Sequence, residues 1–352
     1  MAFATPKRIL VTGGTGYIGS HMVQVLLRRS LAVTVLDDCS RGHQEVIDLL
    51  RSEAASESRP CDLAFERCCV SETERIRDLV RAREIDSVIH FAALAYVGES
   101  VERPLDYWRT NLGGTLSLLA AIEGTSVARF VFSSTCATYG VPEPSLIPIR
   151  EGCPQHPINP YGAAKAAAER AIADFHAAQT ARGISLACAV LRYFNVIGCD
   201  PRGVLGEDHD PETHLVPSAL AAALGRRREL VVMGTDYPTP DGTCLRDYVD
   251  VTDLCEAHWA ALSALTPRAH ETFNVGTGIG HSVLEVLAAC ERVALTRVPS
   301  SRGARRPGDP PLLVADSSLI QRRLAWAPRV TSLDDSIASI WRWMRANPRG
   351  YA

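Results

Sequence analysis

The feature that most constrains the fold is a glycine-rich segment between an apolar run and a helical pattern. Residues 11–19 read Val-Thr-Gly-Gly-Thr-Gly-Tyr-Ile-Gly and follow the apolar run Arg8–Val11. The spacing G-x-x-G-x-x-G is met by Gly13, Gly16 and Gly19. Glycines let the backbone turn tightly and bring the N–H groups of a helix N-terminus close to a pyrophosphate. The segment predicts a strand–turn–helix unit that binds a dinucleotide, although a glycine turn without a ligand would read the same.

An acidic residue further along indicates which dinucleotide is bound. Asp37 ends the second apolar run, 18 residues after Gly19. In strand–helix–strand units of this kind a carboxylate at that distance holds the ribose of the adenosine. The same carboxylate repels a 2′-phosphate, so we predict NAD rather than NADP. Arg41 lies nearby and weakens this preference slightly.

Apolar runs and helical patterns alternate through the first half of the chain. We predict strands, of which the third is the weakest, at Arg8–Val11, Leu31–Leu36, Leu63–Cys68, Ser87–Phe91, Phe130–Phe132 and Leu186–Phe194. The main helices are predicted at Tyr17–Arg29, Thr73–Arg83 and Leu105–Ile122. This alternation is typical of the α/β class with a doubly wound, Rossmann-type parallel sheet.

The pattern changes in the second half, where loops interrupt shorter elements, notably at Cys199–His214 and Tyr237–Thr243. We predict a Rossmann domain over residues 1–190 and a smaller, interleaved substrate-binding lobe over residues 191–352. Some segments of the lobe are expected to return to the first domain. Ligands of doubly wound sheets bind at the strand ends, which the lobe would cover. The polar stretch Glu53–Pro60 is expected to be a solvated loop.

One tyrosine–lysine pair predicts acid–base chemistry. Lys165 is one of two lysines among 37 basic residues, and it follows Tyr161 by four positions. Keeping a lysine in an arginine-rich chain indicates a need for a compact ammonium. Asn159-Pro160 reads as a helix start, which places both side chains on one helix face. Taken alone, the same spacing also fits an ordinary amphipathic helix.

The energetics of this pair call for a further cation. Ionising a tyrosine at neutral pH costs about 4 kcal/mol. One ammonium at ~5 Å, with an effective dielectric constant of about 20, returns roughly 3 kcal/mol. Lys165 is therefore expected to lower the pKa of Tyr161 most of the way toward neutral pH. A second positive charge, such as an oxidised nicotinamide ring, would complete the shift.

The composition excludes other classes of protein. The net charge of −3 and the scattered basic residues give no electrostatic footprint for nucleic acid. No apolar run approaches the ~20 residues of a membrane-spanning helix. The 11 cysteines include no C-x-x-C pair, and the chain shows no signal peptide. We therefore expect a cytoplasmic protein with reduced thiols that binds neither membranes nor nucleic acid.

A group of histidines and acidic residues invites a metal interpretation. His209 and His214 occur with Asp208, Asp210 and Glu212 in a Pro-containing segment. The five-residue spacing of the histidines in such a loop is poor for ligating a metal ion. We therefore predict no metal site here.

Further motifs extend along nearly the whole chain. They include His90-Phe-Ala-Ala93, Phe132-Ser-Ser-Thr-Cys-Ala-Thr-Tyr-Gly140, Leu191-Arg-Tyr-Phe-Asn195, Asp241-Gly-Thr-Cys-Leu-Arg-Asp-Tyr248, Asn274-Val-Gly-Thr-Gly278 and Arg305-Arg-Pro-Gly-Asp309. With the glycine segment and the Tyr161–Lys165 pair, they resemble the extended short-chain dehydrogenase/reductases. Within that group the chain resembles the UDP-glucose/UDP-galactose 4-epimerase family.

The resemblance implies a role for each matching residue. Tyr161 would be the catalytic acid–base, Lys165 its modulator, and Thr135 the hydroxyl that bonds the 4-hydroxyl of the sugar. The family usually has a serine in place of Thr135. The implied NAD contacts are Gly13, Gly16, Tyr17, Ile18, Gly19, Asp37, Asp38, Ser40, Cys69, Val70, Phe91, Ala92, Ala93, Asn111, Lys165 and Phe194.

The resemblance also implies a binding site for a UDP-sugar. Its contacts would be Thr135, Tyr161, Asn195, His214, Leu215, Val231, Met233, Arg246, Tyr248, Arg306, Asp309 and Leu313. Arg246 and Arg306 suit a diphosphate because forked guanidinium donors pair with phosphate oxygens; surface ion pairs are the alternative. Leu313 stands where the family controls access for an N-acetyl group, although a core leucine fits the same run.

Three positions depart from the family pattern. Cys69 replaces an aspartate that contacts the adenine, and Ala95 replaces a lysine near the cofactor and the substrate. Met233 replaces an aromatic residue that faces the uracil, where a thioether can still pack against the ring. These changes affect expected affinity and nucleotide preference, and none of them removes the chemistry.

Two positions argue against related reactions. Sugar-nucleotide dehydratases typically carry Thr-Asp-Glu before the Tyr-Gly pair, and the decarboxylases commonly retain the glutamate. The corresponding residues here are Cys136 and Ala137, and neither can transfer a proton to a leaving hydroxyl. We therefore expect NAD-dependent epimerisation at C4 of a UDP-sugar through a transient 4-keto intermediate.

The sequence constrains the identity of the sugar and the oligomeric state less strongly than it constrains the reaction. UDP-glucose and UDP-galactose are the first expectation, and UDP-xylose/UDP-arabinose or UDP-glucuronate are alternatives. The segments Thr135–Gly140 and Phe194–Gly198 also resemble the UDP-xylose/UDP-arabinose branch. A non-catalytic regulator that binds NAD or a UDP-sugar is a further alternative, against which Thr135, Tyr161 and Lys165 argue. The family implies a homodimer through the Leu105–Ile122 and Tyr161–Ala181 helices.

Overall fold

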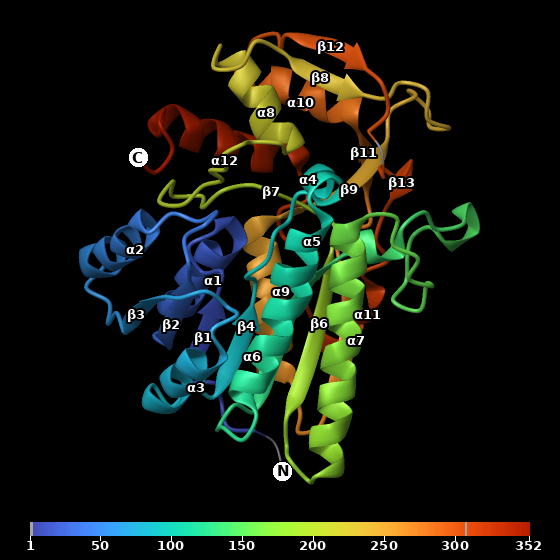
Figure 1. The fold of residues 1–352 in the computed structure, drawn as a ribbon. Coiled ribbons are helices and arrows are strands. Elements are labelled where there is room, and N and C mark those ends of the chain that lie inside the picture. The colour runs from blue at the N-terminus through green and yellow to red at the C-terminus, as the bar shows by residue number, and fades with distance from the viewer. Residues whose placement is uncertain (1–2, 307) are drawn as a thin grey trace.

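A seven-stranded parallel sheet forms the centre of the computed structural model, which describes residues 3–306 and 308–352 (Figure 1). The strand order is β10-β6-β5-β4-β1-β2-β3, and every neighbouring pair is parallel. The strands are β1 (Arg8–Thr12), β2 (Ala32–Asp37), β3 (Leu63–Arg67), β4 (Ser87–His90), β5 (Arg129–Thr135), β6 (Ala187–Tyr193) and β10 (His270–Val275). The order reverses direction between β1 and β4, which is where sheets of this kind bind their ligands. The predicted α/β fold with a doubly wound sheet is confirmed.

Helices cover both faces of this sheet because its strands are apolar on both sides. In β1, Ile9 and Val11 pack into one buried cluster, and Leu10 packs into another on the opposite face. The first face is covered by α1 (Tyr17–Arg28), α2 (Glu45–Ser56) and α9 (Val251–Ala264). The second face is covered by α3 (Thr73–Ala82), α6 (Gly114–Ile122) and α7 (Pro160–Ala181). The result is a three-layer arrangement.

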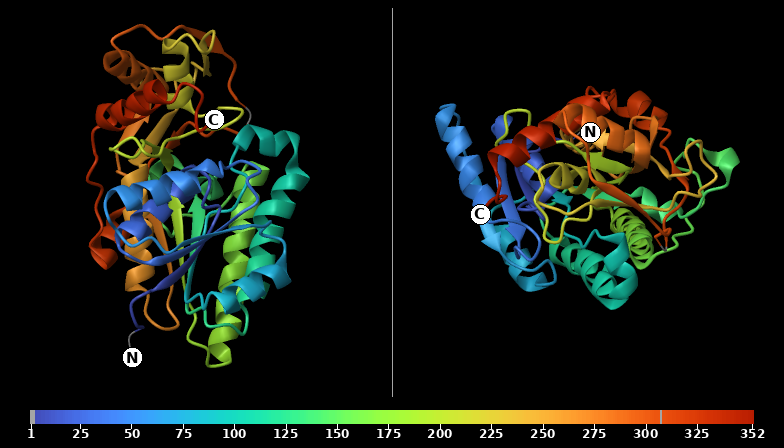
Figure 2. Two further views of the ribbon diagram at one scale, coloured as in Figure 1. Left: turned by 90° about the vertical axis from the view of Figure 1, so that its left-hand side faces the viewer. Right: turned by 90° about the horizontal axis from the view of Figure 1, so that it is seen from above.

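A smaller lobe lies over the carboxyl ends of the large sheet, at the top of Figure 1 and nearest the viewer in the right panel of Figure 2. It contains a sheet with the order β11-β9-β13, to which β7 adds through β9, and a two-stranded pair of β8 and β12. Its strands are β7 (Asn195–Ile197), β8 (Leu230–Met233), β9 (Leu245–Asp250), β11 (Gly280–Ser282), β12 (Ser300–Gly303) and β13 (Leu312–Leu313). Its helices are α8 (Leu215–Ala223), α10 (Val283–Ala294) and α12 (Leu333–Ala346), and α11 (Ser318–Leu324) lies beside β10.

The single helix expected at Leu105–Ile122 is divided into three parts. These parts are α5 (Pro104–Tyr107), a π-helical segment η1 (Trp108–Gly113) and α6. A further short helix, α4 (Val97–Glu102), precedes them. Inside η1 the buried Asn111 accepts a hydrogen bond from the N–H of Leu94 and donates one to its carbonyl oxygen. The wider π-helical turn occurs together with this buried amide side chain. The spacing of apolar residues in the sequence predicts neither of them.

The expected solvated loop at Glu53–Pro60 is wrong for its first four residues, because α2 continues to Ser56. Glu53 is only 8% exposed. Its carboxylate accepts hydrogen bonds from Gln24, Arg28 and Arg202, at 2.6 to 3.1 Å. These donors from distant parts of the chain make burial of the charge possible, and a local sequence pattern cannot show them.

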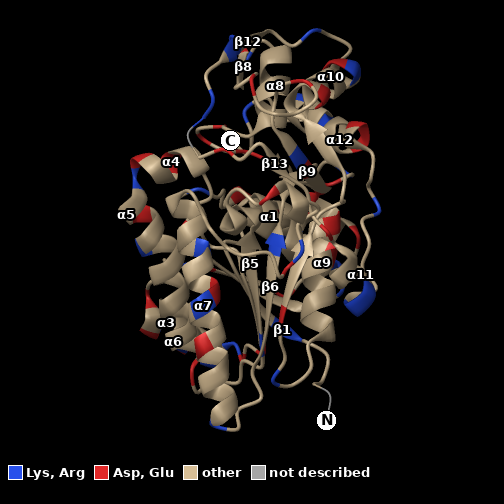
Figure 3. Cartoon of the chain, turned by 90° about the vertical axis from the view of Figure 1, so that its right-hand side faces the viewer, with Lys and Arg blue, Asp and Glu red and all other residues tan. Residues whose placement is uncertain are grey.

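The remaining strand and helix predictions agree with the structure to within a few residues. Two 3-10 turns, Cys136–Tyr139 and Pro144–Leu146, follow β5. Over the described residues, no helix is both long and apolar enough to cross a membrane. Basic and acidic residues are mixed on the side of the molecule that faces the viewer in Figure 3, in line with the small net charge.

Candidate active site

A cavity of about 610 Å³ lies between the carboxyl ends of the large sheet and the smaller lobe. Its wall takes residues from the glycine segment, from the ends of β2, β4 and β5, from α7 and from β8, β9 and β13. All the residues predicted to bind cofactor or substrate line this cavity, with the exception of Asn111. Asn111 lies behind the wall and holds Leu94, which does line it.

The glycine segment combines tight packing with an open surface. A Cβ atom on Gly13, whose φ is +72°, would lie 2.6 Å from the backbone nitrogen of Ala92. A Cβ on Gly19 would lie 2.0 Å from the carbonyl oxygen of Gly13, so neither glycine tolerates a side chain. At Gly16 the corresponding contact is 3.4 Å, and no side chain caps the start of α1. The free N–H groups of α1 therefore face the cavity and suit a pyrophosphate.

Asp37 is fixed at the edge of the same cavity. Its two carboxylate oxygens accept hydrogen bonds from the N–H groups of Thr15 and Cys39, at 3.0 and 2.9 Å. Arg41 forms an ion pair with Glu99 and lies 5.2 Å from the ring centroid of Tyr96. Since the guanidinium of Arg41 is already paired, it offsets the charge of Asp37 less than the sequence suggested. The residues present fit NAD.

The tyrosine and the lysine both lie near the start of α7. Asn159 caps this helix, and its side-chain oxygen accepts a hydrogen bond from the N–H of Gly162 at 2.8 Å. Tyr161 and Lys165 are 7% and 3% exposed, and both line the cavity. Lys165 Nζ donates to the carbonyl oxygen of Ser133 at 2.8 Å, which ties α7 to β5. The cap and this bond set the direction in which both functional groups point.

Burial dominates the protonation of this pair. It raises the pKa of the Tyr161 phenol, the neighbouring Tyr193 adds to the rise, and the Thr135 hydroxyl opposes it. Burial also lowers the pKa of Lys165 to about 7, against the attraction of Glu169. These side chains alone do not produce the expected lowering for Tyr161, because burial penalises the phenolate and the ammonium together.

Thr135 lies at the end of β5 and caps the 3-10 turn that follows. Its Oγ1 accepts a hydrogen bond from the N–H of Ala137 at 3.1 Å, which leaves its own hydroxyl proton free to donate. Cys136 and Ala137 also line the cavity. Burial raises the pKa of Cys136 to about 12, so this thiol stays protonated. The cavity wall therefore has no carboxylate directly after β5.

Two arginines also line the cavity. Arg246, on β9, is 8% exposed and lies 3.7 Å from Asp309 Oδ1. Arg306 is partly buried and, among the described residues, has no carboxylate partner. Its neighbour Arg305 is exposed and pairs with Asp236 instead. The surface ion pair considered for Arg306 is thus made by Arg305, and Arg306 is available for an anion.

Leu313 combines the two roles considered for it. It packs with Cys136 and Phe194 in a buried apolar cluster, and it also lines the cavity. The parallel pairing of β13 with β9 places Leu313 opposite Arg246. Its side chain therefore borders the space between the acid–base pair and the arginines.

Several residues of the cavity wall escaped the sequence-based prediction. They are Tyr96, Tyr193, Glu207, His209 and Arg227. Arg227 belongs to a run of three arginines that resembles a solvated surface. Its side chain instead donates to Ser218 Oγ at 3.0 Å. Glu207 precedes the noted histidine segment, and a search for carboxylates on both sides of that segment would have found it.

The histidine segment folds into a compact cluster in the cavity wall. Glu207, His209, Glu212 and His214 each place one ligand-type atom within 4.8 Å of the others. Burial alone would lower the pKa of each histidine, but the two glutamates outweigh it and raise the pKa of His209 to about 9 and that of His214 to about 10. Burial opposes ionisation of Glu212, yet the histidines lower its pKa to about 2.

The comparisons with known proteins agree with this geometry. The family model described as the NAD dependent epimerase/dehydratase family matches residues 9–276. A UDP-glucose 4-epimerase of Halalkalibacterium halodurans is 42% identical over 345 residues, which are 98% of this chain and 97% of the relative. A putative UDP-arabinose 4-epimerase of Arabidopsis thaliana is 43% identical, over 97% of this chain and 77% of the relative.

A solved structure extends the likeness to three dimensions. The UDP-glucose 4-epimerase of Bifidobacterium longum, in complex with NAD+ and UDP, superimposes with a TM-score of 0.91 at 35% identity. The match covers 98% of this chain and the whole of the other. The family model spans most of the chain, and the two relatives match 97% and 98% of it. The chain belongs to the NAD dependent epimerase/dehydratase family.

Proposed function

We propose that this protein is an NAD-dependent UDP-sugar 4-epimerase, with UDP-glucose and UDP-galactose as its first substrate pair. One observation carries the proposal. Thr135, Tyr161 and Lys165 line the same cavity as the glycine segment and the two arginines, and the positions after Thr135 carry no carboxylate. Such a site can exchange a proton and a hydride at one carbon, and it lacks the extra acid and base that elimination of water requires.

Each side chain has a defined part in this reaction. NAD, held by the glycine segment and Asp37, would supply reversible hydride transfer at C4 of the sugar. Tyr161 accepts the proton of the 4-hydroxyl and later gives it back. The hydroxyl of Thr135 donates a hydrogen bond to the same oxygen. The ammonium group of Lys165 supplies positive charge in the same cavity as the phenol. The glycine segment and Asp37 hold the cofactor.

Arg246 and Arg306 bind the diphosphate in this proposal. Charge-assisted bonds to phosphate oxygens are strong and directional, which anchors the nucleotide while the sugar remains free to turn. Rotation of the 4-keto sugar about its link to the diphosphate presents the other face for reduction.

A second substrate pair is supported by one observation. The relative from Arabidopsis thaliana, named as a putative UDP-arabinose 4-epimerase, is as similar to this chain as the UDP-glucose 4-epimerase of Halalkalibacterium halodurans. Pentose sugar nucleotides lack the C6 hydroxymethyl group and would fit any cavity that accepts the hexose. UDP-xylose, whose 4-epimer is UDP-arabinose, is therefore included in the test below.

The proposal extends to assembly and setting. We propose a homodimer through the region of residues 105–122 and α7, a cytoplasmic location and a role in galactose metabolism. Leu105 is 62% exposed, and Leu116, also in this region, is 47% exposed, which supports an interface there. The division into a cofactor domain over residues 1–190 and a substrate lobe over residues 191–352 is part of the same proposal.

The decisive experiment is a substrate panel. Purified protein is incubated with UDP-glucose, UDP-galactose, UDP-xylose, UDP-glucuronate and UDP-N-acetylglucosamine, and the products are separated by chromatography. We expect interconversion of UDP-glucose and UDP-galactose without net formation of NADH, because the hydride returns to the same sugar. A 4,6-dehydrated product, or no product from any of the five sugars, would refute the proposal.

A binding titration tests the cofactor. We expect NAD to copurify with the protein or to bind far more tightly than NADP, because the carboxylate of Asp37 repels a 2′-phosphate. Titrating cofactor-free protein with each dinucleotide gives the ratio of the two dissociation constants. The Asp37→Asn variant serves as the comparison and should narrow that ratio. A clear preference of the unmodified protein for NADP would refute the role of Asp37.

A further inference from the structure

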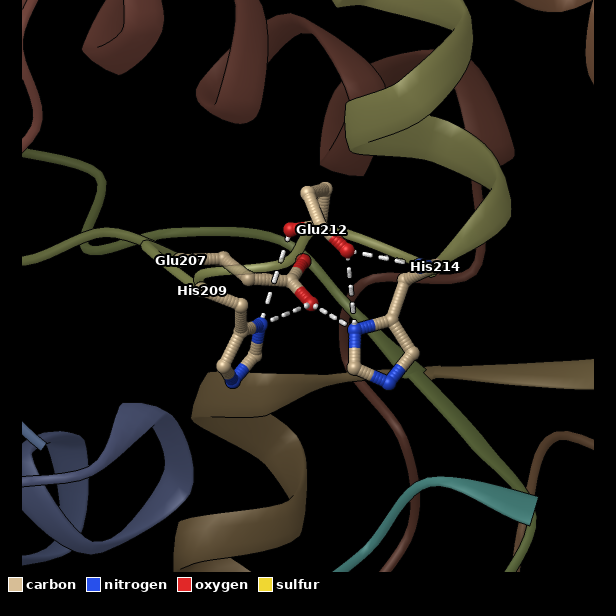
Figure 4. Close-up of side chains that lie close together, drawn as sticks. All are labelled: Glu207, His209, Glu212 and His214. Carbon is tan, nitrogen blue, oxygen red and sulfur yellow. Dashed lines mark hydrogen bonds and ion pairs between the residues drawn. The ribbon is translucent and has the colours of Figure 1, made fainter. Parts of the chain in front are cut away.

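The segment Glu207–His214 directs two carboxylates and two imidazoles toward one point (Figure 4). Glu207 Oε1 lies 3.4 Å from His209 Nδ1 and 2.8 Å from His214 Nδ1. The carboxylate of Glu212 lies 3.5 Å and 3.3 Å from the same two nitrogens. Around a tetrahedral metal ion, with bonds of about 2.0–2.1 Å, neighbouring ligand atoms lie about 3.3 Å apart. The four distances between a carboxylate and a histidine nitrogen are close to this value, and all four ligand atoms lie within 4.8 Å of one another.

Spacing in the sequence argued against ligation here, and the structure removes that objection. The segment instead folds back so that the rings of His209 and His214 are 4.9 Å apart, centroid to centroid. Each ring presents its Nδ1 atom to the carboxylate of Glu207 (Figure 4).

Hydrogen bonding within the cluster does not satisfy these groups. Among the described residues, neither His209 Nδ1 nor His214 Nδ1 has a hydrogen-bond partner of good geometry. The second oxygen of Glu207, Oε2, is also without a partner, although this side chain is only 1% exposed. A buried carboxylate with an unpaired oxygen is destabilising unless something else compensates its charge. The observation points to a cation that the cluster is shaped to receive.

We propose that Glu207, His209, Glu212 and His214 form a binding site for a divalent transition-metal ion, with zinc as the best match. Two imidazole nitrogens and two carboxylate oxygens are a donor set that suits Zn²⁺, which favours four ligands at tetrahedral corners. The two carboxylates neutralise the charge of the ion. This proposal does not depend on the proposed epimerase activity.

The ligand count indicates what the ion does. Four protein ligands leave no open position for a reactive water, so the site is structural rather than catalytic. His214 immediately precedes α8, and Glu207, His209 and His214 all line the cavity. A bound ion therefore fixes this part of the cavity wall and the start of α8. The alternative state of the cluster is two protonated histidines paired with two carboxylates, which binds no metal.

Cobalt provides a direct test, because Co²⁺ in a tetrahedral site absorbs visible light. Untagged protein with its cofactor is freed of metal with a chelator and titrated with Co²⁺. We expect one equivalent to bind with tetrahedral bands and without thiolate-to-cobalt charge transfer in the near ultraviolet. That spectrum separates this site from the 11 cysteines. Zn²⁺ should then displace the cobalt and raise the melting temperature.

Variants locate the ion. His209→Gln and Glu207→Gln should weaken Co²⁺ binding by at least ~10–100-fold, which is the loss found even for outer partners of metal ligands. His156→Gln removes an exposed histidine outside the cluster and should bind like the unmodified protein. If Glu207→Gln does not fold, His209→Gln, whose side chain is 14% exposed in the original, decides the question. The proposal is overturned by an absence of tetrahedral binding, by thiolate bands, or by equal affinity in the cluster variants and the control.

Discussion

At the scale of single residues, the chemistry depends on a phenol whose ionisation the protein alone opposes. Burial raises the pKa of Tyr161 and lowers that of Lys165 to about 7. The pair therefore becomes an efficient proton acceptor only when further positive charge enters the cavity. This dependence couples proton transfer to an occupied cofactor site, because a sugar bound without NAD would meet a neutral phenol.

Replacing the phenol tests its role. We expect Tyr161→Phe to lower kcat by ~10²–10⁴, the usual contribution of a positioned acid–base group, while the protein keeps its fold and its NAD. Tyr237→Phe is the matched control, because its hydroxyl lies outside the cavity wall and, among the described residues, has no hydrogen-bond partner. It should keep normal turnover. Near-normal turnover of Tyr161→Phe would remove this residue from the mechanism.

Lys165→Arg tests whether the compact ammonium is needed. Lys165 reaches the carbonyl oxygen of Ser133 from within a buried space. A guanidinium is broader and stays charged, so we expect it to displace α7 or the phenol and to lower kcat severely. Circular dichroism and NAD content show whether the fold survives. Unimpaired turnover in this variant would contradict the role given to Lys165.

Leu313 is expected to limit the size of the sugar. The kcat/KM for UDP-N-acetylglucosamine should be lower than that for UDP-galactose. The Leu313→Ala substitution should reduce the difference between these two kcat/KM values. Crowding differences of this kind are worth about 1–3 kcal/mol, or about 10–200-fold in kcat/KM. The packing lost with the side chain is at most a few kcal/mol. The measurement is kcat/KM for UDP-galactose and its N-acetyl analogue in both proteins.

Leu312→Ala is the control for that comparison, because Leu312 is the neighbouring residue of β13 and does not line the cavity. The ratio of the two kcat/KM values should stay unchanged in this variant. An unchanged ratio in Leu313→Ala as well would assign Leu313 to the apolar core alone.

At the scale of elements, α7 is placed by its first residues. The Asn159 cap fixes the helix start, and the next residues carry the functional groups into the cavity. We expect Asn159→Ala to destabilise the protein by about 0.5–2 kcal/mol and also to lower kcat, because the first turn of α7 loses its anchor. Thermal unfolding and steady-state kinetics measure the two effects.

Ser332→Ala separates the two effects. Ser332 caps α12 by accepting a hydrogen bond from the N–H of Asp335, and α12 does not line the cavity. This variant should show a comparable loss of stability with normal kcat. If Asn159→Ala also kept a normal kcat, the cap would serve stability only.

The elements that could be predicted are those with a local physical signal. The run before Gly13, the glycine spacing and Asp37 together specify β1, the turn, α1 and the end of β2. The features that were predicted wrongly depend on contacts with residues distant in the chain. The helical position of Glu53 depends on Arg28 and Arg202, and the π-helical segment depends on Asn111 binding Leu94.

The same difference between local signals and distant contacts applies to the residues of the candidate active site. Residues within matched motifs, such as Thr135 and Arg306, lie on the cavity wall as expected. Glu207 and Arg227 also line the cavity, but they reach it only because the loops that carry them fold against it. Linear spacing gave no sign that His209 and His214 lie close together, because the distance between side chains in a loop depends on the path of the loop, which tertiary contacts determine.

At the scale of the whole molecule, exposed apolar side chains on α4, α5, η1 and α6 support self-association. Val101, Leu105, Trp108 and Leu116 are between 37% and 62% exposed. We expect Leu105→Lys to convert the proposed dimer to a monomer, because a charged side chain at the centre of an apolar interface is costly to bury. Size-exclusion chromatography with light scattering measures the mass.

Leu295→Lys provides the comparison. Leu295 is 91% exposed just after α10, far along the chain from the proposed interface. The charge change is the same, so any general effect on solubility should appear in both proteins. A monomeric unmodified protein, or loss of the dimer in both variants, would contradict the proposed interface.

The position of β10 has a consequence for the newly made chain. This strand pairs with β6, yet the whole segment from β7 through α9 lies between them in the sequence. A ribosome would therefore release a sheet whose outer strand lacks its neighbour until residue 275 has emerged. An open edge of this kind invites pairing with other chains. A fragment that stops at residue 190 should therefore aggregate, and the cell would have to shield β6 during synthesis.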